Sequence, residues 1–225
     1  MHKQFKFLFW LNALIHILSI ILEIEWLRFI TKPLLMIFLG LYFYYSVDRN
    51  AFTKSIMLAI IFSFGGDVAL MFQDIAPIYF ILGLASFLIA HLFYVYAMVK
   101  YPNFKQGFLV KEWWWSLPFL AYGIGLVTFL WSDLKEMTVP VIIYSITIML
   151  MGLSALNMKG RVSKSVAIYI LLGAILFILS DSVIALSKFK AEDLMIRMPN
   201  LIIMITYILG QFLIVEGVVK QETQL

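Results

Sequence analysis

The chain has 225 residues, of which 63% are hydrophobic and only 13% are charged, and its mean hydropathy is +0.97. A soluble domain is nearer half apolar and a quarter charged, so this excess of apolar residues indicates a polytopic membrane protein. The net charge of +4 does not indicate a nucleic-acid partner, because the basic residues lie singly in short loops and form no stripe.

The first predicted element begins with Lys3 and Lys6, followed by an apolar run from Phe7 to Leu22, a pattern similar to a secretory signal. No small-x-small cleavage site follows, so we expect a retained first transmembrane helix. Seven further apolar runs follow, and most reach the about 17 to 25 residues that cross a bilayer. The sequence therefore predicts an all-α protein with a single domain over residues 1–225 and eight transmembrane helices. The expected helices cover residues 6–22, 33–47, 55–73, 77–99, 115–132, 138–157, 165–187 and 199–219.

An even number of crossings places both chain termini on the same side of the membrane. Eleven of the 17 lysine and arginine residues lie at the termini or in the loops on that side. Positive residues concentrate in the cytoplasmic loops of membrane proteins. We therefore expect cytoplasmic termini and a multi-pass protein of the inner (cell) membrane.

A weak internal repeat relates the two halves of the chain. The third expected helix contains "FSFGGDVAL" and the seventh contains "FILSDSVIAL". In the helix that follows each, an aromatic residue precedes a polar one by four positions, Phe87 before His91 and Tyr207 before Gln211, which keeps each pair on one helix face. We interpret this as a possible duplication of four helices, with the copies parallel about an axis along the membrane normal. The alternative is a chance alignment of apolar helices.

Two acids, Asp67 and Asp181, lie well inside expected helices. An acid at the bilayer centre costs at least about 2.5–3.5 kcal/mol, so such a residue normally faces the interior of the helix bundle and has a function. Each lies roughly 9–10 Å inside the end of its helix, in the same outer layer, so the two could meet. The adjacent Gly65 and Gly66 would let the third helix approach a neighbour closely. The alternative role for each acid is a protonated, hydrogen-bonded structural group.

Two carboxyl groups that share a poorly hydrated site do not both ionise readily, so one can keep its proton and donate it. The ionised partner can then orient and deprotonate a water molecule. This pattern is typical of acid–base hydrolysis and requires neither a metal nor another cofactor. The sequence has no cysteine, only three histidines and no HExxH motif, which disfavours a metal hydrolase.

Several segments resemble the YhhN family of integral membrane proteins, whose animal members are lysoplasmalogenases. The resemblance rests on the order and spacing of "TKPLL" (31–35), "SFGGDVALM" (63–71), "LGLASFLIAHLFYVY" (82–96), "PVIIYSITIMLMGLSA" (140–155), "LLGAILFILSDSVIAL" (171–186) and "YILGQFLIV" (207–215). It implies hydrolysis of the vinyl ether bond of a lysoplasmalogen to a fatty aldehyde and a glycerophospho head group. It also implies that Asp67 and Asp181 are the catalytic residues.

The substrate of this family is a lysophospholipid, whose phosphate needs a cation. We expect Lys32, at the start of the second helix, to contact the head group, although helix-end lysines commonly only extend to the interface. Ser180 and Ser182 flank Asp181 and could hydrogen-bond it. The remaining residues expected to bind substrate are His91, Tyr94, Tyr144, Tyr207 and Gln211.

A transporter is the alternative to a hydrolase. Intramembrane acids and a parallel repeat also occur in carriers of small molecules or lipids, where the acids form a proton relay. The expected helices show no clearly broken pair of the kind that many transporters use, since Pro77, Pro140 and Pro199 all lie near helix starts. Product formation would favour the hydrolase, and gradient-dependent uptake would favour the carrier.

Overall fold

The computed structural model describes residues 2–190 and 194–223, and these residues form helices and connecting turns without any strand. This confirms the expected all-α, polytopic fold class. Within these described residues eight long helices follow one another, joined by short connections that include the four-residue helix α5 (Phe108–Lys111). The long helices are α1 (His2–Ile21), α2 (Glu25–Tyr44), α3 (Ala51–Met71), α4 (Pro77–Lys100), α6 (Leu117–Leu134), α7 (Thr138–Leu156), α8 (Lys164–Phe189) and α10 (Pro199–Glu222).

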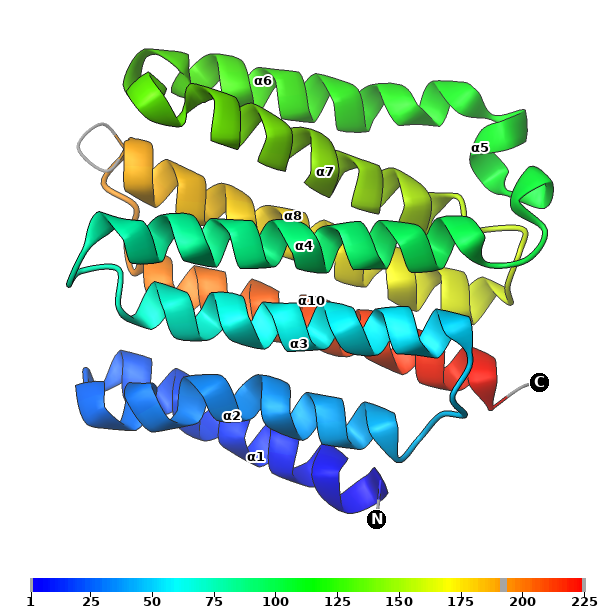
Figure 1. Cartoon of the computed structure of the whole chain (residues 1–225), viewed down its shortest axis with the longest axis horizontal. Helices are drawn as coiled ribbons and strands as arrows, with labels where there is room; N and C mark the ends of the chain where they lie inside the picture. The colour runs from blue at the N-terminus through cyan, green and yellow to red at the C-terminus, as the bar shows by residue number, and fades with distance from the viewer. Residues whose placement is uncertain (1, 191–193, 224–225) are drawn as a thin grey trace. The chain divides into compact units, whose positions relative to one another are not determined.

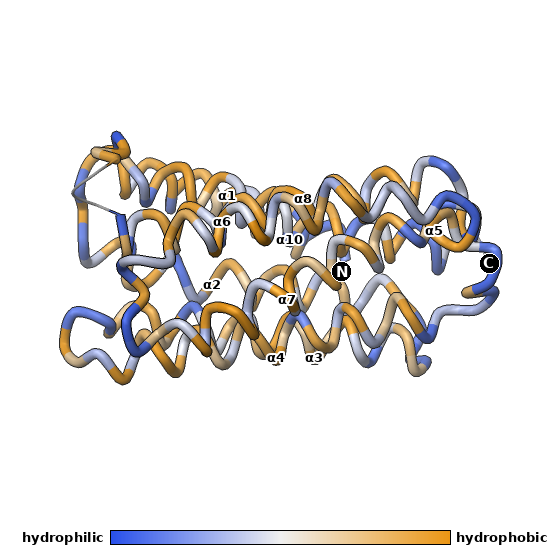
Figure 2. The backbone as a smooth tube through the Cα atoms, turned by 90° about the horizontal axis from the view of Figure 1, so that it is seen from above, coloured by the Kyte–Doolittle hydropathy of each residue, from blue (hydrophilic) through white to orange (hydrophobic). Residues whose placement is uncertain are grey.

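The helices are long and apolar enough to cross a membrane. Seven helical stretches of the described residues meet this criterion, and one of them, residues 113–156, contains both α6 and α7. Hydrophobic residues run along the helices, and hydrophilic residues gather in the connections between them (Figure 2). Large apolar side chains such as Phe7, Trp26 and Ile124 are exposed, as lipid-facing residues of a membrane protein would be.

The chain divides into two compact units. The first contains residues 1–100 and the last turns of α10 from Val218 onward, and the second contains residues 101–217. In the first unit α1 packs against α2, α2 against α3, and α3 against α4 (Figure 1). In the second unit α6 packs against α7 and both contact α8. The division falls after the fourth long helix, where the possible duplication would also divide the chain, and the duplication itself stays a prediction.

Helix α2 differs most from the expectation. It begins at Glu25, eight residues before the expected start, and contains Pro33 in its interior. Proline is tolerated inside transmembrane helices because neighbouring helices and Ser or Thr side chains satisfy the backbone groups that it frees. The expected start at residue 33 was therefore wrong. Lys32 lies about two turns inside α2 and not at its first residue.

Helices α8 and α10 touch through glycine. A Cβ atom added to Gly173 would lie 2.7 Å from the carbonyl oxygen of Gly210, and one added to Gly210 would lie 2.9 Å from the carbonyl oxygen of Gly173. Close to this crossing the rings of Phe177 and Tyr207 meet edge to face, with centroids 5.4 Å apart. Small residues at such crossings let backbones approach where lipid provides no hydrophobic driving force.

Candidate functional site

Asp67 is buried in α3, with 2% of its surface exposed. It lies four residues before the end of the helix, or about 6 Å along the axis. The backbone beside it is tightly packed, because a Cβ atom at Gly66 would lie 2.6 Å from the Phe87 ring and one at Gly65 would lie 2.8 Å from Ser86 Oγ. The Ser86 hydroxyl donates to the carbonyl of Phe62 at 2.6 Å and so also joins α4 to α3.

Lys32 lies near enough to Asp67 for their opposite charges to attract. Both residues belong to the first unit, where α2 packs on α3. A buried carboxylate is tolerated when an opposite charge compensates it, and Lys32 provides that charge. The position of Lys32 inside α2 differs from that of a helix-end lysine that only extends to the interface.

His91 and Tyr94 are fully buried in α4. The contact between Gly66 and Phe87 fixes the register of α3 against α4, and His91 follows Phe87 by four residues. His91 therefore lies only about one turn, roughly 6 Å, deeper than Asp67. Helix α4 begins ten residues before Phe87, whereas α3 ends five residues after Gly66, so α4 extends farther than α3 at this end.

Asp181 lies in α8 and is half-buried. The hydroxyl of Tyr144, from α7, donates a hydrogen bond of 2.5 Å to Asp181 Oδ2. A hydrogen bond to a carboxylate is shorter and about twice as strong as one between neutral groups. Tyr144, which we expected to bind substrate, thus contacts an aspartate directly.

The two serines beside Asp181 do not hydrogen-bond it, contrary to the expectation. Ser180 is buried and donates to the carbonyl of Ile203 in α10 at 3.1 Å. Ser182 donates to the carbonyl of Ile178 at 2.7 Å and accepts a bond of 2.9 Å from Tyr122. Neighbouring residues in a helix point in different directions, so the flanking serines face other elements.

Tyr207 and Gln211 lie one turn apart in α10, and both are buried. Tyr207 packs against Phe177 of α8, and the Gly173–Gly210 crossing holds the two helices together. Both residues belong to the second unit, and their spacing of four places them on the same helix face. Their role in substrate binding stays a prediction.

A buried polar network joins α1 to α2, and the sequence provided little signal for it. Asn12 donates to the Thr31 carbonyl at 2.8 Å, and His16 Nδ1 lies 2.8 Å from the Thr31 hydroxyl oxygen. Thr31 immediately precedes Lys32, so this network fixes the helix turn that carries the lysine. The presence of His16 inside an apolar helix was the single hint available from the sequence.

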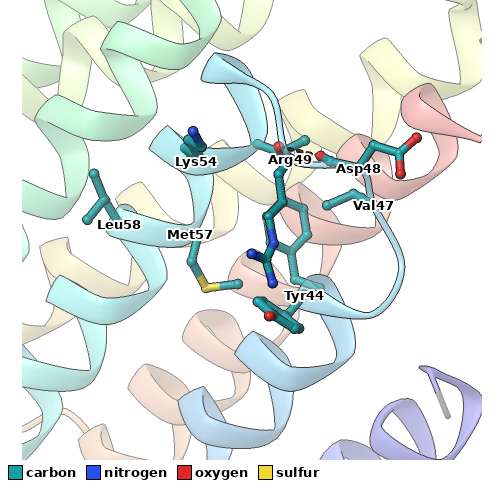
Figure 3. Close-up of a pocket in the computed structure, with 9 residues that line it drawn as sticks. Tyr44, Val47, Asp48, Arg49, Lys54, Met57 and Leu58 are labelled. Carbon is teal, nitrogen blue, oxygen red and sulfur yellow. Dashed lines mark hydrogen bonds between the residues drawn. The ribbon is translucent and has the colours of Figure 1, made fainter.

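Besides a pocket lined by residues between Lys3 and Leu8, two surface pockets lie within single units. One has a volume of about 380 Å³ and lies at the α2–α3 connection, where the Arg49 guanidinium carbon is 4.6 Å from the centre of the Tyr44 ring (Figure 3). The other, of about 750 Å³, has Lys111, Lys159 and Lys164 among its lining residues. Neither contains an expected site residue. Among the described residues, no group of three or more His, Cys, Asp or Glu side chains could hold a metal ion.

Comparison with known proteins identifies a family and one human relative that resemble this chain. The model of the YhhN family matches residues 27–218. The human protein lysoplasmalogenase TMEM86B is 29% identical over 192 residues, covering 85% of this chain and 75% of the human protein. No solved structure matches the chain.

Proposed function

The chain belongs to the YhhN family, and from this premise we propose that it is a membrane hydrolase that cleaves the vinyl ether bond of lysoplasmalogens. The products are a fatty aldehyde and a glycerophospho head group. The main support is its similarity, over most of its length, to a human protein named as a lysoplasmalogenase. Two aspartates inside membrane helices, each with a polar group of its own unit beside it, supply suitable chemistry.

The reaction needs a proton donor and a carboxylate. A proton adds to the vinyl carbon remote from the ether oxygen, which produces an oxocarbenium ion. Water adds to this cation and loses a proton, and the hemiacetal then breaks its carbon–oxygen bond to release aldehyde and alcohol. The sum is the addition of one water molecule. In the proposed mechanism Asp67 and Asp181 share these duties, as paired carboxylates do in glycoside hydrolysis, where the transition state is also cationic.

The decisive experiment measures release of the fatty aldehyde and asks whether the hydrogen added to its carbon chain comes from solvent. Purified protein in detergent is given a lysoplasmalogen, the matching alkyl ether lysophospholipid and the matching acyl lysophospholipid. We expect aldehyde from the vinyl ether alone, and in heavy water the aldehyde should carry one deuterium at the carbon next to its carbonyl. Fatty acid from the acyl lipid, or the absence of aldehyde from folded protein, would refute the proposal.

A proton-coupled carrier is the second candidate function. The electrostatic interaction between Lys32 and Asp67 inside membrane helices favours it, because opposite charges that interact within the membrane occur in proton relays. Uptake of a lysophospholipid into liposomes that depends on a proton gradient, without any aldehyde, would support this candidate over the hydrolase.

Tyr144→Phe should lower kcat about 10- to 100-fold with little change in KM. The substitution removes the hydroxyl that donates to Asp181, and a hydrogen bond to a charged group contributes about 1.5–3 kcal/mol. Steady-state kinetics of aldehyde release measure the effect. Tyr122→Phe is the matched control, since its hydroxyl bonds to Ser182 and not to an aspartate. Equal losses in both variants would argue against a specific role for Tyr144.

Lys32→Ala should raise KM by about tenfold or more and reduce kcat less, because losing a charged contact to a phosphate costs about 1.5–3 kcal/mol in binding. Lys54→Ala, which removes an exposed lysine at the start of α3, is the control. Unchanged KM in Lys32→Ala would remove this residue from the head-group site.

A further inference from the structure

A cluster of basic side chains surrounds the α1–α2 polar network. Arg28 and Lys32 are four residues apart in α2, a spacing that places them on one helix face. His16 of α1 lies close enough to both for their charges to act on it. The two α2 residues lie within about the first two turns of that helix, and Lys32 interacts electrostatically with Asp67. We refer to His16, Arg28 and Lys32 as the basic cluster.

Two nitrogen atoms of the basic cluster are buried and have no hydrogen-bond partner among the described residues. They are Nε of Arg28 and Nε2 of His16. The His16 side chain as a whole has only 2% of its surface exposed. Buried polar groups are nearly always hydrogen-bonded, and each exception costs about 1–3 kcal/mol. Two exceptions in one cluster point to a ligand that supplies the missing partners.

The hydrogen bonds around Thr31 determine what His16 can offer. The Thr31 hydroxyl donates its hydrogen to the carbonyl of Leu27 at 2.7 Å, so its oxygen accepts from His16 Nδ1 at 2.8 Å. In a neutral imidazole with its hydrogen on Nδ1, Nε2 is an acceptor. His16 therefore presents an acceptor, whereas Arg28 and Lys32 present positive charge and donors.

A lysophospholipid carries the complementary groups in adjacent positions. Its phosphate is an anion that matches guanidinium and ammonium donors. Its free glycerol hydroxyl, one carbon closer to the ether, is a donor that matches His16 Nε2. Only the glycerol backbone separates the phosphate from the ether oxygen, and Lys32 interacts electrostatically with Asp67. A phosphate on the basic cluster would thus hold the ether end of the lipid near Asp67.

We propose that Arg28 and Lys32 bind the phosphate of the lipid substrate, and that His16 accepts a hydrogen bond from its free glycerol hydroxyl. The identity of the lipid rests on the proposed function above. Arg28 is only half-buried and has a long, flexible side chain, so its movement can admit the head group. His16 becomes the residue that distinguishes a lysophospholipid, which has a free hydroxyl, from a phospholipid with two chains.

The test measures binding and does not depend on catalysis. The probe is a 1-alkyl lysophosphatidylethanolamine, which has no vinyl ether to cleave. It is compared with its methoxy analogue, in which the hydroxyl is capped, and with 1-alkylglycerol, which has no phosphate. The native protein should bind the probe about tenfold or more tightly than either analogue, as expected for charged or buried hydrogen bonds. Equal dissociation constants for all three lipids would overturn the proposal, whether or not aldehyde is released in the separate assay.

Variants assign the two parts of the site. Arg28→Gln should weaken the probe about tenfold or more and leave 1-alkylglycerol unchanged. His16→Phe should abolish the preference for the free hydroxyl over the methoxy group and keep the preference for phosphate. Arg49→Gln, at the α2–α3 connection, is the control and should bind as the native protein does. The assignment would be refuted if both cluster variants kept the selectivity of the native protein. It would also be refuted if inorganic phosphate bound as tightly as the probe and displaced it.

Discussion

Asp67→Asn and Asp181→Asn should each reduce the rate of aldehyde release by about 100- to 10,000-fold, the contribution that a positioned acid or base makes to a proton transfer. Asparagine has nearly the same shape as aspartate but cannot exchange a proton under these conditions. Asp67 is buried beside Lys32, and Asp181 accepts the Tyr144 hydrogen bond, so both carboxylates have environments that the substitutions would change. The measurement is kcat/KM for a lysoplasmalogen.

Asp133→Asn is the matched control for these variants. Asp133 lies at the end of α6, partly exposed, and forms an ion pair of 2.5 Å with Lys190. A surface ion pair contributes about 0–1 kcal/mol, so the control should keep native activity and stability. Melting temperatures in detergent establish that the two inactive variants are folded. Activity within threefold of native in either Asp67→Asn or Asp181→Asn would exclude that residue from the proton transfers.

Gly173→Leu should prevent folding of the second unit or destabilise the protein by about 3 kcal/mol or more, the upper end of the cost of overpacking. A Cβ atom at Gly173 would lie 2.7 Å from the carbonyl oxygen of Gly210 and 2.8 Å from the backbone nitrogen of Ile214. Backbone atoms within a helix cannot move aside as a flexible side chain can, so α8 and α10 would have to separate. Yield of monodisperse protein and Tm in detergent report the effect.

Gly125→Leu provides the control within the same unit. A Cβ atom at Gly125, in α6, meets nothing within 4 Å, so a leucine there would face open space. Because leucine is a better helix former than glycine, this variant should be as stable as the native protein or slightly more stable, by up to about 1 kcal/mol. A native Tm for Gly173→Leu would show that the glycine crossing is not needed.

The eight helices could be predicted because a segment that crosses lipid needs a long run of apolar side chains. A helix is expected for each run because it pairs the backbone groups that lipid cannot hydrogen-bond. Helix α2 was the main error in its bounds. The Lys32–Pro33 pair marks a break in soluble proteins, whereas here α2 continues through it from Glu25 to Tyr44. The helix continues because it packs against α1 and α3, and such contacts between helices appear in no local sequence pattern.

The candidate site was predictable in part. Asp67 and Asp181 stood out because acids are costly inside membrane helices. Their partners did not, because the lysine that compensates Asp67 and the tyrosine that binds Asp181 come from other helices, 35 and 37 residues away in the chain. The expectation that the residues next to Asp181 would hydrogen-bond it was wrong, since Ser180 and Ser182 donate to backbone carbonyls.

The sequence by itself determined that the chain crosses a membrane, where most of its helices lie and which acids need an explanation, because hydropathy and the cost of charge act on each residue in its own segment. Only the tertiary structure decided that Tyr144 bonds to Asp181 and that Lys32 interacts electrostatically with Asp67. It also decided that buried nitrogen atoms of His16 and Arg28 have no hydrogen-bond partner among the described residues. Those facts depend on the rotation and register of each helix against its neighbour. Packing between helices fixes both, as the glycine contacts of Gly66 do for α3 and α4 and those of Gly173 do for α8 and α10.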